Sequence, residues 1–473
     1  MKLAEQDALA LIPAKFDVLN MDVDTFYKAV LVKLLNPGFH AYRERLERYL
    51  VGVTARFALQ NSPFFARFYG DAAAALQAVD DFRVERLPVL TRQDLVTAGD
   101  SLFASNELDL PSFSSGTTTG RSLSLIHSGR ARENVRELFR RLRARRRGGD
   151  AAPAQGFALK LAMLATGNDS ESRQYTVFSK IVHGMNKAMD RLQHNATQPS
   201  ASTRVAFISG HPFDVVDLTM AALRRFGDEF DAVRAPVQQI QTTGTYVSPH
   251  LRAWIENAWQ AQLIDTLSFS EAPVFASSCP DCGLYHFHPF CHAEAVDAAG
   301  APLQQGRGRL LLTAYYPTAI TTPIIRYDIG DYVERVPVEC QRDPVGYRFL
   351  GRVKDSIGIL PTQGSENFLG ASEIVDILDD LPDVNRPVPI NNVGFSDFVR
   401  DQKHWPLYEL TNDAGELKLY VQLRFPTRAF PERVNELEQL IRARLSTKAP
   451  WLHAAKDPAR LQIVFREPER RII

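Results

Sequence analysis

Apolar residues recur along the chain at two spacings, one typical of helices and one typical of strands. In residues 130–147 the apolar side chains fall on one helical stripe, which predicts an amphipathic helix. The first hundred residues are also expected to be largely helical. Within them, Thr91 is expected to cap a helix that carries Asp94 in its first turn.

The middle of the chain alternates short apolar runs with helical patterns, which is typical of α/β layering. Buried strands are expected at 157–165, 204–209 and 263–268, helices at 216–226 and 249–260, and further β-rich runs at 309–316 and 321–327.

The last part of the chain has a different pattern. Apolar and polar residues alternate over 417–425, which predicts a half-buried strand. A turn is expected before it at 412–415, with a partner strand at 405–410. Apolar residues at helical spacing over 434–445 then predict an amphipathic helix. We therefore predict an α/β fold with a large multi-layered N-terminal domain, in which helices flank β-sheets, and a small mobile α+β C-terminal domain. The expected boundary divides the chain into residues 1–351 and 352–473.

Composition limits the classes of partner. The 473 residues hold 55 Lys plus Arg and 55 Asp plus Glu, so the balanced charge gives no general attraction to nucleic acid or to an anionic membrane. The N-terminus shows no signal-peptide pattern, and the apolar stretch at 310–325 contains Pro317 and Pro323, which argues against a membrane span. We expect a cytoplasmic protein with reduced thiols.

A run of hydroxyl residues and glycines, Ser114 to Gly120, is the strongest local motif. Glycine lets the backbone approach a ligand closely, and successive N–H groups can form an anion-binding nest. The run lacks the lysine and spacing of a Walker A loop. A polar surface loop is the alternative interpretation, although the β-like residues 123–126 that follow favour a structured loop.

Five segments together resemble the adenylate-forming enzymes, in the branch of the phenylacetate–coenzyme A ligases. The order and distances of the segments agree over roughly residues 60–445. They are 87–91 (LPVLT), 114–120 (SSGTTTG), 267–271 (LSFSE), 326–331 (RYDIGD) and 349–355 (FLGRVKD).

This resemblance implies ATP-dependent activation of an aryl or acyl carboxylic acid as an acyl-adenylate, followed by transfer to coenzyme A. Glu271 would bind Mg²⁺ and, with Thr118, would be catalytic. Asp331 would hold the ribose with support from Arg352, and Asp355 would be the hinge of the small domain. The full set of implied nucleotide-binding residues is Ser114, Ser115, Gly116, Thr117, Thr118, Thr119, Gly120, Thr243, Gly244, Thr245, Ser270, Asp331 and Arg352.

The chain also departs from the family pattern. Leu267 stands where the family has a tyrosine, Thr245 where it has a glutamate, and no lysine follows Lys456 where the family has a terminal glycine-lysine pair. Three alternatives therefore stay open: a coenzyme A ligase, a ligase that transfers to an amine or to a carrier-protein thiol, and a non-catalytic nucleotide-binding homologue. A homodimer is also left open.

The cysteines form a possible metal site. Cys279 and Cys282 make a CxxC, and zinc prefers four such ligands in a tetrahedron. Some members of the resembled family hold a structural zinc with a cysteine in the position of Cys340. The expected ligands are Cys279, Cys282, Cys340 and either His286 or Cys291, and unligated thiols are the alternative.

Overall fold

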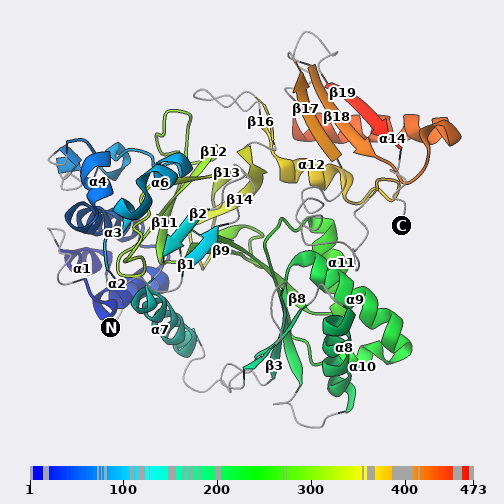
Figure 1. The fold of residues 1–473 in the computed structure, drawn as a ribbon, viewed down its shortest axis with the longest axis horizontal. Helices are drawn as coiled ribbons and strands as arrows, with labels where there is room; N and C mark the ends of the chain where they lie inside the picture. The colour runs from blue at the N-terminus through cyan, green and yellow to red at the C-terminus, as the bar shows by residue number, and fades with distance from the viewer. Residues whose placement is uncertain are drawn as a thin grey trace. The chain divides into compact units, whose positions relative to one another are not determined.

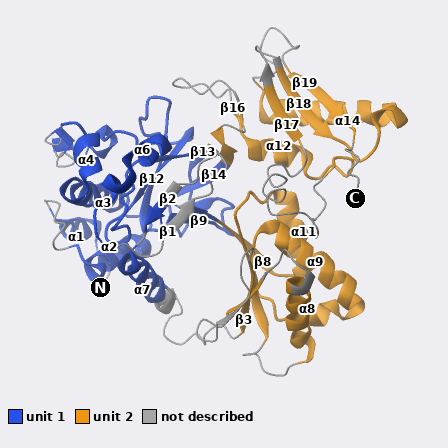
Figure 2. Ribbon diagram, in the orientation of Figure 1, with its two compact units in different colours: residues 1–152, 267–349 blue, residues 153–266, 350–473 orange. Residues whose placement is uncertain are grey.

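The structure of the protein is a computed structural model in which the chain forms two compact units (Figures 1 and 2). The first unit contains Met1–Ala152 and Leu267–Phe349, and the second contains Pro153–Thr266 and Leu350–Ile473. The structure describes residues 4–13, 21–71, 74–75, 77–78, 83–106, 111–114, 123–126, 128–146, 156–162, 167–169, 174–178, 182–197, 204–269, 271–272, 274–353, 356–358, 368–385, 408–413, 416–450 and 461–467. Among the described helices, none is long and apolar enough to cross a membrane.

Helices dominate the N-terminal part of the first unit. They are α1 (Glu5–Ala10), α2 (Val23–Leu35), α3 (His40–Asn61), α4 (Pro63–Phe68), η1 (Val84–Arg86), α6 (Arg92–Ala98), η2 (Gly99–Leu102) and α7 (Gly129–Arg146). Helix α6 begins at a capping box, in which Thr91 and Asp94 satisfy each other's backbone N–H groups. The predicted cap at Thr91 and the predicted helix at 130–147 are therefore confirmed.

The strands of the first unit form a hairpin and an antiparallel sheet. The hairpin is β1 (Pro111–Ser114) with β2 (Leu123–Ile126). The sheet has the order β11-β12-β13-β14-β10-β9. Its strands are β9 (Val274–Ser278), β10 (Tyr285–Phe287), β11 (Cys291–Val296), β12 (Gly306–Ala314), β13 (Tyr327–Pro337) and β14 (Val345–Arg352), the last of which crosses into the second unit.

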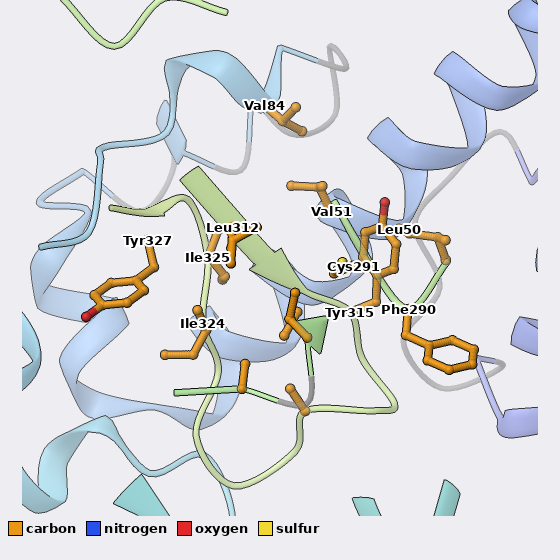
Figure 3. Close-up of a cluster of buried hydrophobic side chains, with 14 of the residues drawn as sticks. Leu50, Val51, Val84, Phe290, Cys291, Leu312, Tyr315, Ile324, Ile325 and Tyr327 are labelled. Carbon is orange, nitrogen blue, oxygen red and sulfur yellow. The ribbon is translucent and has the colours of Figure 1, made fainter. Parts of the chain in front are cut away.

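Residues from both parts of the first unit share one hydrophobic core (Figure 3). Leu50 and Val51 of α3 lie in the same cluster as Leu312 of β12 and Tyr315 beyond it. Each of these side chains is at most 2% exposed. Burial of such apolar surface is the main stabilising contribution of a domain core.

Arg326 joins the N-terminal segment of the first unit to the start of β13. The guanidinium is 2% exposed and pairs with the Glu294 carboxylate, with 3.1 Å between Arg326 Nε and Glu294 Oε2. It also donates hydrogen bonds to three backbone carbonyls, those of Glu85, Leu87 and Gly300. A buried charge is tolerated only when it is paired and hydrogen-bonded, and both conditions hold for Arg326.

The predicted β-rich run at 321–327 is wrong, because β13 begins only at Tyr327. Pro323 has no N–H to donate to a strand ladder, and Arg326 has a positive φ of 47°. The backbone of this segment bonds instead to scattered partners, such as the Arg326 N–H to the Thr313 hydroxyl at 2.9 Å. The companion prediction at 309–316 is confirmed by β12.

The first part of the second unit is a mainly parallel sheet covered by helices. The strand order is β8-β7-β6-β3-β5-β4, in which only β4 pairs antiparallel among the described strands. The helices lie together beside these strands (Figure 1) and share one core with them. The elements are β3 (Phe157–Ala162), β4 (Gly167–Asp169), β5 (Gln174–Phe178), β6 (Val205–Gly210), β7 (Gln239–Thr243), β8 (Gln262–Phe269), α8 (Val182–Thr197), α9 (Pro212–Phe226), η4 (Gly227–Glu229), α10 (Phe230–Arg234) and α11 (Pro249–Trp259).

The rest of the second unit is a small α+β structure with its own core. Strand β17 (Tyr408–Asp413) pairs antiparallel with β18 (Glu416–Gln422), and β19 (Leu461–Arg466) pairs parallel with β18. The other elements are β15 (Ile357–Gly358), β16 (Phe368–Leu369), α12 (Ala371–Leu378), η6 (Thr427–Ala429) and α14 (Pro431–Lys448). The predicted α/β class, with a large sheet flanked by helices and a small separate sheet, is confirmed.

Two acidic residues connect α12 to the segment that begins α11, within the second unit. Tyr246 donates a hydrogen bond to Asp376, with 2.9 Å between Oη and Oδ1, and Ser248 donates one to Asp379. Burial raises the pKa of Asp376 from its ordinary 3.8 to about 6, and the carboxylates of Asp379 and Glu373 add to this, against the opposing effects of Tyr246 and Lys448. The folded second unit therefore binds the proton of Asp376 more tightly than the unfolded chain does.

The stabilising contribution of Asp376 is expected to be complete below pH 3.8 and lost as the pH rises through about 6. Replacement of Asp376 by asparagine should therefore stabilise the second unit at pH 7.5, by roughly 1–2 kcal/mol. All four tryptophans belong to this unit, so tryptophan fluorescence during urea unfolding reports on it selectively. Asp380→Asn is the matched control, because the hydrogen bond from Arg444 lowers the pKa of Asp380. Removal of the Asp380 carboxylate should therefore destabilise the second unit instead.

Candidate functional site

Four predicted ligands come together in the first unit: Cys279, Cys282, His286 and Cys340. Their ligand atoms all lie within 4.8 Å of one another. Cys279 follows β9, His286 lies in β10, and Cys340 lies between β13 and β14. Ligands from three separate segments of the chain are therefore brought together. The Sγ atoms of Cys279 and Cys340 are 3.8 Å apart.

The backbone around the cluster is fixed by a tight turn. The Cys279 N–H donates to the Leu284 carbonyl, and the Gly283 N–H donates to the Cys279 carbonyl, both at 2.8 Å. Gly283 has a φ of +72°, a conformation that glycine adopts without steric cost. The turn therefore presents Cys279 and Cys282 from the same side, as a CxxC metal site requires.

The donor set fits zinc. Two sulfurs bound to one tetrahedral zinc at about 2.3 Å lie about 3.8 Å apart, which matches the distance between the Cys279 and Cys340 sulfurs. His286 uses Nδ1 for the Val345 carbonyl at 2.9 Å, so Nε2 faces the cluster, 3.1 Å from the Cys282 sulfur. Burial lowers the pKa of His286, which favours the neutral imidazole that binds a metal.

Cys291, the alternative ligand, lies elsewhere. Its thiol donates to the His288 carbonyl at 3.3 Å and its side chain belongs to the hydrophobic core. Cys291 and Glu47 both line a cavity of about 470 Å³. The Glu47 carboxylate lies 2.5 Å from Nζ of Lys33 and 3.3 Å from Nδ1 of His292. Burial raises the pKa of the Cys291 thiol far above its usual range, so this thiol stays protonated.

Glu271, the predicted magnesium ligand, lies in the turn between β8 and β9. Its side chain is 17% exposed, and its Oε1 lies 3.6 Å from Nη1 of Arg92, whose side chain is 18% exposed. Arg92 is the first residue of α6 and directly follows the N-cap residue Thr91. The structure therefore places a guanidinium beside the carboxylate that is the predicted magnesium ligand.

Asp331, the predicted ribose ligand, lies on β13 and is partly exposed. The preceding residues are held by Asp328, which pairs with Arg309 at 2.6 Å and accepts the Gly330 N–H at 2.9 Å. Gly330 lies in β13 and has a φ of +76°, so the backbone directly before Asp331 favours glycine. The backbone that carries Asp331 is thus well defined.

The predicted adenine segment, Thr243–Thr245, follows the carboxyl end of β7 in the second unit. Gly244 has a φ of +103°, and a Cβ at this position would lie 3.0 Å from the His211 ring. His211 follows β6 and caps α9. Ligands of open α/β sheets bind at the carboxyl ends of parallel strands, and both segments lie there. Arg352, at the end of β14, is exposed.

Part of the predicted site lies outside the described residues, namely Ser115–Gly120, Ser270 and Asp355. The strands on either side of this motif are described, and Ser114 pairs with Leu123 at the loop end of the β1–β2 hairpin.

Two residues beside the predicted site were not expected from the sequence. Arg92 belongs to no motif of its own, although it follows the 87–91 segment, and His211 belongs to none of the predicted motifs. Each becomes visible only when the fold brings it next to a predicted residue, Glu271 and Gly244 respectively.

The sequence comparisons return no match to a family model and no match to a curated protein. The structure is similar to that of 2-hydroxyisobutyryl-CoA ligase in the postadenylation state with R3-HIB-AMP, with a TM-score of 0.61 and 15% identity over 91% of this chain and 87% of that one. An open conformation of the same ligase, with 2-HIB-AMP and CoA, gives a TM-score of 0.60 and 16% identity over 92% and 90%. At this identity the likeness establishes the fold, and the chain therefore has the fold of the adenylate-forming CoA ligases.

Proposed function

We propose that the protein activates a carboxylic acid with ATP and Mg²⁺ and transfers the acyl group to coenzyme A. The observation that carries the proposal is the structural similarity over about nine-tenths of both chains to a ligase whose structures hold an acyl-adenylate. The ordered sequence motifs support the same proposal, because their described residues include the ends of β1, β8 and β14 and the start of β13.

The proposed reaction has two steps. A carboxylate oxygen of the acid attacks the α-phosphorus of ATP, the bond to the β-phosphate breaks, and pyrophosphate leaves. The coenzyme A sulfur then attacks the acyl carbon, the bond to AMP breaks, and the thiol proton goes to solvent. The first step brings anions together, so positioning and charge neutralisation are the main contributions required of the protein.

Individual residues have proposed roles in this reaction. The Glu271 carboxylate would hold the magnesium, which supplies charge neutralisation at the phosphates when it is bound. Ser114–Gly120 with Thr118, and Ser270, would bind the phosphates, Thr243–Thr245 the adenine, and Asp331 with Arg352 the ribose. A small domain at 352–473 would rotate about Asp355 between the two steps.

We also propose that Cys279, Cys282, His286 and Cys340 hold a structural zinc. The four donors leave no open position for a substrate, which is the arrangement of structural zinc sites. The metal would join the turn after β9 to the segment between β13 and β14.

Exchange of labelled pyrophosphate into ATP tests the first step. A panel of aryl, acyl and hydroxy acids would be tested, and we expect exchange only when a suitable acid is added. We also expect a thioester to form when coenzyme A is supplied. An amine or a carrier protein in place of coenzyme A distinguishes the alternative acceptors. Absence of exchange with every acid, in protein that remains folded, would refute the proposed activity.

A further inference from the structure

Asp343 organises the backbone of the segment between β13 and β14, which carries the proposed zinc ligand Cys340. Its Oδ1 accepts the N–H of Val345, two residues further along, at 3.0 Å, as an aspartate does in an Asx turn. The Val338 N–H donates to the Pro344 carbonyl at 2.9 Å and closes the segment into a loop. Cys340 therefore lies inside a loop whose backbone is held by hydrogen bonds of its own.

The Asp343 carboxylate is also connected to a second proposed ligand, His286. The Val345 N–H donates to Asp343, and the carbonyl of the same residue lies 2.9 Å from His286 Nδ1. Because a carbonyl oxygen can only accept, Nδ1 carries the proton and Nε2 has the lone pair that binds a metal. A single residue, Val345, thus links the Asp343 carboxylate to the imidazole.

Arg43 of α3 holds the other oxygen of the Asp343 carboxylate, although the two residues are 300 positions apart in the chain. Nη1 of Arg43 donates to Oδ2 of Asp343, and the two side chains are 8% and 20% exposed. Within the described part of the chain, Nε and Nη2 of Arg43 have no hydrogen-bond partner. Asp343 is therefore the group that compensates for burial of this guanidinium, and solvent screens the pair less than it screens a surface ion pair.

A metal site needs ligands whose directions are fixed by their neighbours. Groups that hold the ligands in place typically contribute roughly 10- to 100-fold to metal affinity. The two cysteines of the CxxC share one turn, whereas His286 and Cys340 come from separate segments of the sheet. The position of His286 relative to Cys340 must be set by other residues, and Asp343 is bonded to the backbone next to both.

We propose that Asp343 and Arg43 are positioning residues of the zinc site, which fix Cys340 and His286 relative to each other and thereby strengthen zinc binding. This inference rests on the proposed zinc site and is independent of the proposed activity. It makes helix α3 part of the support of a metal site whose ligands all come from the sheet and its loops. An ion pair that only stabilises the fold is the alternative that the experiment separates.

Substitutions in this pair should weaken zinc binding in a graded order. Asp343→Ala removes both the acceptor for Val345 and the partner of Arg43, so the dissociation constant for zinc should rise roughly 10- to 100-fold. Asp343→Asn and Arg43→Met should each cause a smaller rise, because an acceptor for the Val345 N–H remains. The double variant Arg43→Met with Asp343→Ala should bind zinc about as weakly as Asp343→Ala, since both residues act through one carboxylate.

Competition between the full chain and a chromophoric chelator measures the dissociation constant for zinc. Asp328→Ala is the matched control, because Asp328 also accepts the N–H of the residue two positions further along, Gly330, at 2.9 Å and pairs with an arginine, Arg309, at 2.6 Å. It lies on β13 in the same unit and outside the cluster of proposed ligands. Its removal should leave the dissociation constant for zinc unchanged.

Melting temperatures with and without zinc separate a positioning role from a purely structural one. A ligand stabilises the folded state by an amount that falls as its dissociation constant rises. The difference in melting temperature between the zinc-loaded chain and the chain in excess chelator should therefore shrink in Asp343→Ala. An equal fall in both temperatures with an unchanged dissociation constant would overturn the proposal, and so would additive losses of affinity in the double variant.

The outcomes also distinguish this inference from the proposals made above. If the wild type holds no zinc, the proposed zinc site and this inference fail together. If the wild type holds zinc and the variants bind it equally tightly, only the inference fails. Acid-dependent pyrophosphate exchange tests the proposed activity separately, because none of the variants replaces a predicted nucleotide-binding residue.

Discussion

Replacement of Glu271 by glutamine is expected to lower acid-dependent pyrophosphate exchange by roughly 100- to 1,000-fold, a loss typical of removing one group that stabilises transition-state charge. Glutamine keeps the shape of the side chain but loses the negative charge that a hard divalent cation prefers. Because the side chain lies in a turn and is partly exposed, the fold should tolerate the change. The measurement is the exchange rate at saturating acid, over a range of magnesium concentrations.

Glu133→Gln provides the control for this substitution. Glu133 lies on α7 in the same unit, and its side chain is 70% exposed, so its loss should leave exchange unchanged. A rate for Glu271→Gln within a factor of about three of the wild type would remove Glu271 from the proposed magnesium site.

Loss of the proposed zinc site is expected to have the largest effect on stability. Structural zinc contributes its binding free energy to folding, so Cys282→Ser should lower the stability of the first unit by on the order of 5 kcal/mol. For a unit of this size, that loss corresponds to a fall in melting temperature of roughly 10–20 °C. The purified wild type should contain one equivalent of zinc, and the variant much less.

Selective spectroscopy makes this test specific to the first unit. All four tryptophans belong to the second unit, so the early transition of Cys282→Ser should appear in far-ultraviolet circular dichroism and not in tryptophan fluorescence. Cys291→Ala is the matched control, because Cys291 lies outside the cluster and its removal should preserve the zinc. Zinc well below one equivalent in the wild type would contradict the proposal.

Local signals in the sequence predicted local structure well. The N-cap at Thr91, the amphipathic helix of 130–147 and the hairpin of β17 and β18 depend on neighbouring residues, and all three predictions are confirmed. The run at 321–327 shows the limit of such signals. Its apolar residues suggest a strand, but Pro323 and the positive φ of Arg326 divert the backbone to partners that are distant in sequence.

The candidate site depended more on the resemblance than on pattern. Cys279 and Cys282 are adjacent in one turn, whereas Cys340 lies 61 residues further along and was included because of the family. Arg92 could not be predicted by either route. Its relation to Glu271 arises from the pairing of Leu90 with Tyr327, a contact across more than two hundred residues that no short motif encodes.

The hydrogen bonds of Arg326 also constrain how this protein can be recombined with proteins of the same fold. Its guanidinium reaches the carbonyl of Leu87, 239 residues earlier in the chain, as well as Glu294 and Gly300. A chimera whose crossover separates residues 85–92 from residues 294–328 would combine a guanidinium and a loop from different parents. Chimeras that fold should therefore take both residues 85–92 and residues 294–328 from one parent. Chimeras that take the two stretches from different parents should be rare among the folded members of a shuffled library.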